Sequence, residues 1–291
     1  MIGTRITQQM LNQSALNGLQ SNLSRNQKLQ EQLSSGKLVS RPSDDPAAAT
    51  NSMLLRSQQR LDDQYLRNID DAAGRLNTAD SALQDISAQL LRAKELIVNA
   101  ADEALPDSSR SAITSELAVI KKGIIDSYNT KWLGRPVFGG TAQGSVAIDD
   151  TGAYVGNDQP TVARIAREVT IRTDVSGTDS GAATLPGLLD QITASITNGT
   201  SDFPDLQDQL DSTLNTLLTT NGEVGARAAQ VASTQTRVNG EQLDLTARIS
   251  QNEDVDLPKA ILDLQSSQVA YQAALGAAGK VLQVSLLDYL R

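Results

Sequence analysis

A row of mostly small and branched apolar residues between Tyr65 and Ala100 recurs in alternating steps of three and four without a break. This spacing is a 3.5-residue period, which is typical of a coiled-coil seam and differs from the 3.6-residue period of an ordinary amphipathic helix. At about 1.5 Å per residue, the row predicts a helix roughly 54 Å long, too long to be enclosed in a compact domain of this size. The seam residues are Tyr65, Ile69, Ala72, Leu76, Ala79, Leu83, Ile86, Leu90, Ala93, Ile97 and Ala100.

A second row with the same alternating steps predicts another long helix between Leu210 and Ile249. Three amides interrupt this row: Asn221, Gln235 and Gln242. Buried amides fix the register of a coiled coil at a cost in stability, but a seam that is simply wetter gives the same pattern, so both interpretations stay open. The apolar members are Leu210, Leu214, Leu217, Val224, Ala228, Val231, Val238, Leu245 and Ile249.

Two less regular stripes predict further helices. The first ends at Ser34-Ser35-Gly36, where glycine suits the left-handed residue that follows a helix. The second follows Pro106, with Asp107 or Ser108 as its N-cap. The stripes are Ile6, Met10, Leu16, Leu19, Leu23, Leu29 and Leu33, and then Ile113, Leu117, Ile120 and Ile124.

The last helix is predicted to begin at Asp256-Leu257-Pro258, a capping residue followed by a first-turn proline. Between Leu264 and Leu287 its only charged residue is Lys280. A helix that is apolar or small on every face requires burial on every face. A membrane span is the rival interpretation, but five polar side chains in it would be costly in hydrocarbon, so we expect packing inside an assembly of many chains. Its heptad row is Leu257, Ile261, Leu264, Gln268, Tyr271, Leu275, Ala278, Leu282, Ser285 and Tyr289.

The middle of the chain has a different composition, with nine of the twenty glycines between Gly134 and Gly187. Short β-prone runs there are separated by Gly, Asp and Asn, as hairpin turns require. The predicted fold is therefore mainly α: a long antiparallel coiled coil or helical bundle formed by both N- and C-terminal segments, with a small β-rich domain inserted. We expect three parts, namely residues 1–42 with 256–291, residues 43–133 with 205–255, and the insert at residues 134–204.

The residue inventory gives no support for catalysis. The chain has no cysteine and no histidine, which excludes thiol nucleophiles, imidazole bases, Cys/His zinc sites and disulfides. We predict that the acidic pairs Asp62-Asp63 and Asp70-Asp71 belong to a solvated helix face, that Asp44-Asp45-Pro46 is a helix start, and that Asp149-Asp150 is a turn. The chain is therefore not expected to be an enzyme or to hold a catalytic residue, cofactor or metal.

Net charge restricts the possible partners. The chain carries a formal charge of −9 without a basic cluster, so neither nucleic acid nor an anionic membrane surface is expected to bind. Residues 1–20 contain no apolar core of a cleavable signal, and we expect none.

Three motifs resemble the flagellin superfamily. Leu33-Ser34-Ser35-Gly36-Lys37, followed by Arg41-Pro42-Ser43-Asp44-Asp45-Pro46-Ala47-Ala48-Ala49, resembles its N-terminal signature, and more narrowly that of its hook-associated branch. Leu133-Gly134-Arg135-Pro136-Val137-Phe138-Gly139-Gly140-Thr141 resembles the loop where the family leaves its first helical block. Ser285-Leu286-Leu287-Asp288-Tyr289-Leu290 resembles the end of the hook-associated branch. The resemblance covers residues 1–141 and 205–291.

The resemblance implies a structural adaptor between the bacterial flagellar hook and filament. Such proteins are exported unfolded, without signal cleavage, and form a ring in a tubular shell. The terminal helices line the channel and the β domain faces outward. The implied partners are further copies of the chain, another hook-associated protein on the hook side, flagellin on the filament side, and an export chaperone at the C-terminal helix.

Two residue sets are expected to matter for that role. The first is an assembly interface of Leu16, Leu19, Leu23, Leu264, Tyr271, Leu275, Leu282, Leu286, Leu287, Tyr289 and Leu290. The second is a connector of Arg41, Pro42, Ser43, Asp44, Asp45 and Pro46, whose prolines either stiffen the chain or only mark helix ends.

Two alternatives are weighed against the adaptor. A flagellin that forms the filament itself shares the coarse features. A signalling coiled coil, such as the cytoplasmic hairpin of a chemoreceptor, is disfavoured because the glycine-rich insert interrupts the seams.

Overall fold

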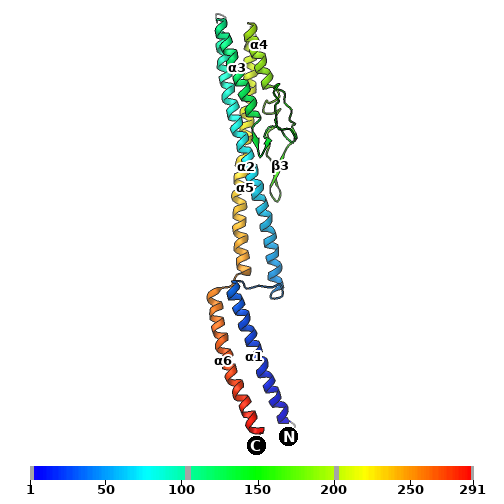
Figure 1. The fold of residues 1–291 in the computed structure, drawn as a ribbon, viewed down its shortest axis with the longest axis vertical. Helices are drawn as coiled ribbons and strands as arrows, with labels where there is room; N and C mark the ends of the chain where they lie inside the picture. Colours follow the sequence, from blue (N-terminus) through cyan, green and yellow to red (C-terminus); the bar gives the residue numbers. More distant parts are fainter. Residues whose placement is uncertain (1–2, 102–105, 200–202, 290–291) are drawn as a thin grey trace. The chain divides into compact units, whose positions relative to one another are not determined.

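The computed structural model describes residues 3–101, 106–199 and 203–289, and helices dominate it (Figure 1). The helices are α1 (Gly3–Ser35), α2 (Pro46–Ala100), α3 (Asp107–Tyr128), α4 (Leu185–Asn198), α5 (Phe203–Glu253) and α6 (Leu257–Tyr289). Two small antiparallel sheets pair β1 (Lys131–Trp132) with β2 (Arg135–Pro136), and β3 (Val162–Ala166) with β4 (Val169–Arg172). The predicted mainly α fold with a small β-rich insert is confirmed.

The chain forms two compact units, and the division falls within α2 and within α5. The central unit comprises residues 61–241, and the terminal unit comprises residues 1–60 with 242–291. The three-part division expected from the sequence stays a prediction.

The predicted seam on α2 forms the core of the central unit. Its ten members from Ile69 to Ala100 are each at most 2% exposed, and Tyr65 at its start is half-buried. Burying a large apolar side chain contributes roughly 1.5–3 kcal/mol, so this row is the main source of stability in the unit.

Helix α5 runs antiparallel to α2 in the central unit, as two contacts show. Lys94 Nζ lies 2.5 Å from Asp211 Oδ1, and Gln235 Nε2 donates to Asp70 Oδ1 at 3.0 Å. Residues later in α2 therefore contact residues earlier in α5, so the two helices run in opposite directions. Every seventh residue of the α5 row is fully buried, while the alternate positions, including Asn221 and Gln235, are only half-buried. Asn221 Oδ1 is buried without a hydrogen-bond partner among the described residues, and Gln235 bonds Asp70 across the two helices, so both interpretations stay open.

Helices α3 and α4 pack against each other and close the same core. Leu117 and Ile124 on α3, and Leu189 and Ile192 on α4, are fully buried. The predicted N-cap of α3 was wrong. Pro106 occupies that position without a side-chain cap, and its carbonyl accepts the N–H groups of Ser109 and Arg110.

The insert is attached to this core at Tyr128, the last residue of α3. Its ring meets the edge of Phe138 with centroids 5.3 Å apart, and its hydroxyl donates to the carbonyl of Ser180. The predicted turn at Asp149 is confirmed, because its Oδ1 accepts the N–H groups of Thr151 and Ala153. The β3–β4 hairpin buries Ile165 and Ile171 toward the core.

The prediction that Asp62 lies on a solvated face was wrong. Asp62 is 4% exposed because it lies three residues before Tyr65, on the seam side of α2. Its Oδ2 has no hydrogen-bond partner among the described residues. Burial raises the pKa of Asp62, the carboxylates of Glu241 and Asp63 raise it further, and Arg167 and Arg237 oppose the shift. Asp70 and Asp71 are exposed, as predicted.

Replacing this buried carboxylate should stabilise the fold. The folded-state pKa lies above the ordinary 3.8, so the charged form destabilises the fold at neutral pH, and this penalty disappears as the pH falls through that pKa. We expect Asp62→Asn to raise the free energy of unfolding by about 1 kcal/mol at pH 7 and by less near pH 3, measured by urea unfolding. Asp85→Asn, at an exposed position of the same helix, is the matched control and should change nothing. A less stable Asp62→Asn protein at pH 7 would contradict the assignment.

Candidate assembly interface

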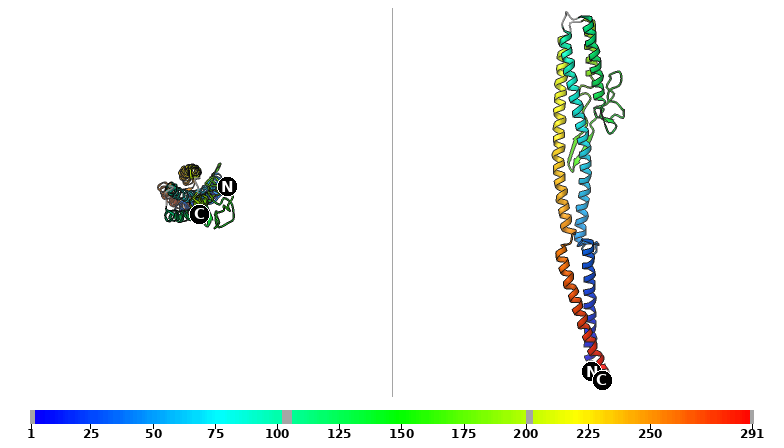
Figure 2. Two further views of the ribbon diagram at one scale, coloured as in Figure 1. Left: turned by 90° about the horizontal axis from the view of Figure 1, so that it is seen from above. Right: turned by 60° about the vertical axis from the view of Figure 1, so that its left-hand side comes forward.

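Helices α1 and α6 form an antiparallel pair in the terminal unit, with the start of α1 beside the end of α6 (Figures 1 and 2). Gly36 ends α1 in the left-handed conformation at φ +70°, as predicted, and its N–H donates to Gln32. Asp256 caps α6 by accepting the N–H of Lys259 at 3.2 Å, also as predicted. The described part of the chain contains no helix long and apolar enough to cross a membrane.

The interior of this pair is partly polar. Among its described side chains the most buried are Asn26, Gln32, Ala260 and Ser267, while leucines such as Leu19 and Leu264 are half-buried. Asn26 Oδ1 and Ser267 Oγ have no hydrogen-bond partner within the described residues. Burying unpaired polar atoms costs free energy, so these positions reduce the stability that the pair gains from its own contacts.

Large apolar side chains of the pair are instead exposed. On α1, Met10, Leu16 and Leu23 are 68%, 54% and 43% exposed. On α6, Leu257, Ile261 and Leu275 are each 46–49% exposed. Exposed apolar side chains on both helices favour an interaction surface.

The predicted heptad row on the last helix is divided between two faces. Leu264, Tyr271 and Ala278 are half-buried, on the side of Ala260 and Ser267 that packs against α1. Leu257, Ile261 and Leu275 form the exposed row. The sequence pattern predicted one seam, whereas alternate members of the row lie on a half-buried face and on an exposed face of the helix.

The predicted interface residues therefore have different environments. Leu16, Leu23 and Leu275 are exposed, whereas Leu19, Leu264 and Tyr271 are half-buried. Leu282, Leu286, Leu287 and Tyr289 belong to the part of α6 whose side chains are not described, and Leu290 lies outside the described residues. Sequence reasoning missed the outward position of Ile261 and of two further residues, Leu262 and Val269.

The connector contains a turn followed by a capped helix start. Asp44 N–H donates to the carbonyl of Arg41 at 2.9 Å, with Pro42 and Ser43 between them. Asp45 Oδ1 accepts the N–H groups of Ala47 and Ala48 at 3.0 and 2.9 Å, and Pro46 is the first residue of α2. The predicted helix start is confirmed, while the role of the prolines stays a prediction.

A charged node, which the sequence analysis missed, links two loops of the terminal unit. One loop joins α1 to α2, and the other joins α5 to α6. Arg56 binds Glu253 through two hydrogen bonds, of 2.9 and 2.5 Å, and Lys37 Nζ lies 2.5 Å from Asp254 Oδ1. Leu38 N–H donates to Glu253 O, and Val255 N–H donates to Gly36 O. The signal available in the sequence was the acidic pair Glu253-Asp254 shortly before Pro258.

Glu253 is the centre of this node, with its side chain 10% exposed. Hydrogen bonds from Arg56 hold the pKa of Glu253 below its ordinary value of 4.5, and Lys37 adds to the effect against the cost of burial. The carboxylates of Glu253 and Asp254 form ion pairs with Arg56 and Lys37. Within the ranges that the structure describes, no three Asp or Glu side chains gather as a metal site.

Removing the charge of Glu253 should loosen the connector. A lowered folded-state pKa contributes stability above the ordinary value of 4.5, and that contribution is lost as the pH falls through the folded pKa. We expect Glu253→Gln to cost about 2 kcal/mol locally at pH 7, and this effect to be lost as the pH falls through the folded-state pKa of Glu253.

The measurement is hydrogen exchange at the amides of Leu38 and Val255, which should accelerate by roughly 30-fold at pH 7. Glu95→Gln, which removes an exposed i,i+3 partner of Arg92, is the control and should leave both amides unchanged. Unchanged exchange in Glu253→Gln would show that the node does not hold the connector.

Comparison with known proteins gives two family matches. A profile of the bacterial flagellin N-terminal helical region matches residues 6–141, and one of the bacterial flagellin C-terminal helical region matches residues 207–290. Together they cover most of the chain outside the insert and α4.

Individual relatives agree with these matches. The chain is 26% identical to flagellar hook-associated protein 3 of Salmonella typhimurium, over 95% of both chains, and 26% identical to a flagellin of Bacillus subtilis, over 93% of both. The structure of a putative flagellar hook-associated protein from Vibrio parahaemolyticus has the same fold, with a TM-score of 0.66 and 23% identity over 72% of this chain and all of that one.

Proposed function

We propose that this chain, which belongs to the flagellin family, is a structural adaptor at the junction between the bacterial flagellar hook and filament. Its work is helix packing with neighbouring axial subunits, and the observation that carries this proposal is the exposed apolar surface of a helix pair that buries polar side chains. A pair built in this way is completed by other chains.

Covering this surface contributes favourable free energy to assembly. Six large side chains are involved, three on each helix, and each is roughly half to two-thirds exposed. If covering the exposed part of each contributes roughly 1 kcal/mol, the pair contributes on the order of 6 kcal/mol per subunit before the entropy of association is subtracted.

The parts of the chain take distinct roles in the proposed ring. Residues 1–42 with 256–291 line the central channel, residues 43–133 with 205–255 form a layer around them, and the insert at residues 134–204 faces outward. The connector Arg41–Pro46 joins the first two layers. Further copies of the chain complete the ring.

Other flagellar proteins bind at the two faces of this ring in the proposal. Another hook-associated protein meets the hook side and flagellin meets the filament side. Before assembly, an export chaperone covers α6, whose residues from Leu264 to Leu287 carry only one charge.

A flagellin that forms the filament itself is the second candidate, since the flagellin of Bacillus subtilis is equally identical to this chain. The two proline-flanked acidic residues of Arg41–Pro46 and the ending Ser285–Leu290 favour the adaptor, because both resemble the hook-associated branch.

Deleting the gene separates the two candidates. Without a junction protein the filament cannot attach, so flagellin subunits should accumulate in the culture medium and swimming in semi-solid agar should stop. Without the filament subunit, no flagellin would remain to be released. Immunoblotting of the medium for flagellin makes the measurement, and re-expression of the intact chain should restore both phenotypes. Absence of released flagellin would contradict the adaptor.

Charged substitutions in the exposed row of α6 test whether this surface packs against other chains. Ile261→Glu with Leu275→Glu should reduce incorporation into isolated flagella at least about tenfold, because two charges would be buried without partners. Val98→Glu, at a 55% exposed position on α2, is the control and should be incorporated normally. Circular dichroism of both purified proteins checks that the helices remain, and normal incorporation of the double variant would contradict the assigned face.

A further inference from the structure

The hairpin between β1 and β2 presents an apolar side chain in an unusual way. Its two-residue turn is Leu133-Gly134, with φ of +48° and +82°. Left-handed backbone at both positions favours Asn-Gly or Gly-Gly, and a branched leucine there is strained. Leu133 is nevertheless 80% exposed, so the fold of this chain gains nothing from it in return.

The hairpin is held rigidly in the central unit. The Trp132 indole lies so close to Gly74 that a Cβ there would come within 2.2 Å of the ring. Its Nε1 donates to Asp71 Oδ1 at 2.8 Å, and Val137 N–H donates to Thr130 O at 3.0 Å. A residue fixed on such a support loses little conformational entropy on binding.

Two cations flank the exposed leucine. Lys131 and Arg135 occupy the two strands beside the turn, and both are exposed. Neither forms an ion pair within the described residues. The complementary surface is therefore a hollow with a partly apolar floor and carboxylates at its rim.

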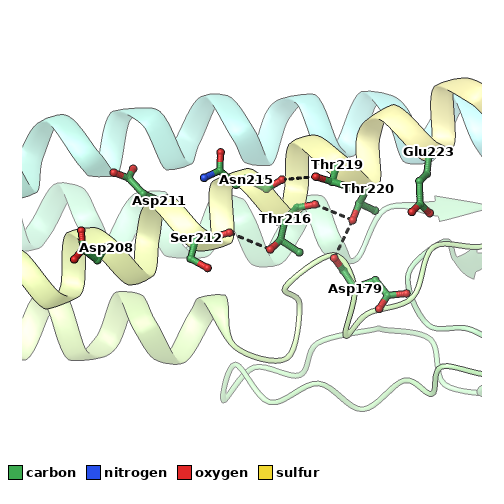
Figure 3. A pocket seen from close by; sticks show the side chains of 9 residues that line it. All are labelled: Asp179, Asp208, Asp211, Ser212, Asn215, Thr216, Thr219, Thr220 and Glu223. Atoms are coloured by element: carbon green, nitrogen blue, oxygen red, sulfur yellow. Dashed lines mark hydrogen bonds between the residues drawn. The ribbon is translucent and has the colours of Figure 1, made fainter.

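The central unit carries a groove of this description on α5, with a volume of about 680 Å³ (Figure 3). Four carboxylates line it, from Asp179, Asp208, Asp211 and Glu223, and no lysine or arginine does. Asp211 and Glu223 are paired with Lys94 and Arg227, whereas the carboxylates of Asp179 and Asp208 form no ion pair within the described part.

The floor of the groove combines hydroxyl and methyl groups. Thr216, Thr219 and Thr220 each donate their hydroxyl to a carbonyl one turn earlier on α5. These hydroxyls are satisfied within the helix, and Thr216 and Thr219 are exposed, so their side chains offer methyl groups as well as oxygen atoms to a partner.

We propose that the Leu133 hairpin of one copy of this chain docks in the α5 groove of a second copy. The hairpin of the same copy lies away from the Asp211 end of the groove. Trp132 lies at Gly74 on α2, whereas Asp211 pairs with Lys94, which is 20 residues or about 30 Å further along α2. A contact between two different surfaces is head-to-tail, and its repetition produces a ring or a helical array. The inference rests on the proposed function, which places copies of this chain side by side.

Cysteine cross-linking tests the contact directly, since the chain contains no cysteine of its own. Flagella are isolated from cells that express Leu133→Cys with Asn215→Cys, or either substitution alone, and are treated with a short bis-maleimide. The double variant should give a ladder of multimers on a denaturing gel, and each single variant should stay monomeric. A monomeric double variant in flagella that contain the protein would overturn the contact, as would a cross-link in Leu133→Cys alone.

This design keeps the two proposals distinguishable. Immunoblotting first shows whether the unmodified chain is present in isolated flagella, which depends on the proposed function and not on this contact. Absence of the unmodified chain would refute the junction role, whereas presence without a ladder refutes only the docking of Leu133.

Charge reversal gives an independent test. Lys131→Glu with Arg135→Glu should reduce incorporation about tenfold, because four carboxylates would face two more. Adding Asp179→Lys and Asp208→Lys to the same chain should restore most of it. Lys122→Glu, at an exposed position on α3, is the control and should be incorporated normally. Equal incorporation of the first variant and the control, or failure of the compensating pair to restore incorporation of a folded chain, would overturn the proposal.

Discussion

The antiparallel contact between α2 and α5 is the interaction on which the central unit depends. Its α2 row is buried almost completely, and α3, α4 and the insert cover the same core from outside. A seam of Leu, Ile, Val and Ala at 3.5-residue spacing needs few aromatic residues, which explains how a chain with one Trp, two Phe and five Tyr holds a continuous core. Two defects interrupt it: the unpaired Asp62 carboxylate and the half-buried amides on α5.

The terminal unit follows the opposite principle. The central unit buries the apolar row of α2 almost completely, although single residues such as Leu133 are exposed, whereas the α1–α6 pair buries Asn26 and Ser267 and exposes Leu16, Ile261 and Leu275. Much of the apolar burial of the central unit is therefore made within one chain. The exposed leucine and isoleucine side chains of the pair are available for contact with other helices. One chain thus combines a self-sufficient part with a part that depends on neighbours, as a subunit exported and then assembled requires.

The Glu253 node lies at the connector of the terminal unit, where the chain passes from α1 to α2 and again from α5 to α6. Lys37 and Arg56 pair with Glu253, and two backbone hydrogen bonds join the same two loops. Such a node holds the connector in one geometry within the chain. Its carboxylate is mostly buried, whereas both members of the Arg237–Glu241 pair on α5 are exposed.

The sequence by itself determined the long helices α2 and α5 and their buried rows, because a 3.5-residue repeat of apolar residues runs along one side of a helix. It did not determine α4, which lies inside the segment expected to be β-rich. It also determined the starts at Asp45-Pro46 and Asp256, the end at Gly36 and the turn at Asp149, since capping is a local interaction. Only the tertiary structure decided which face of α6 meets α1, that Asp62 is buried, and that Glu253 meets Arg56 and Lys37. These outcomes depend on residues far apart in the chain, so no local spacing could specify them.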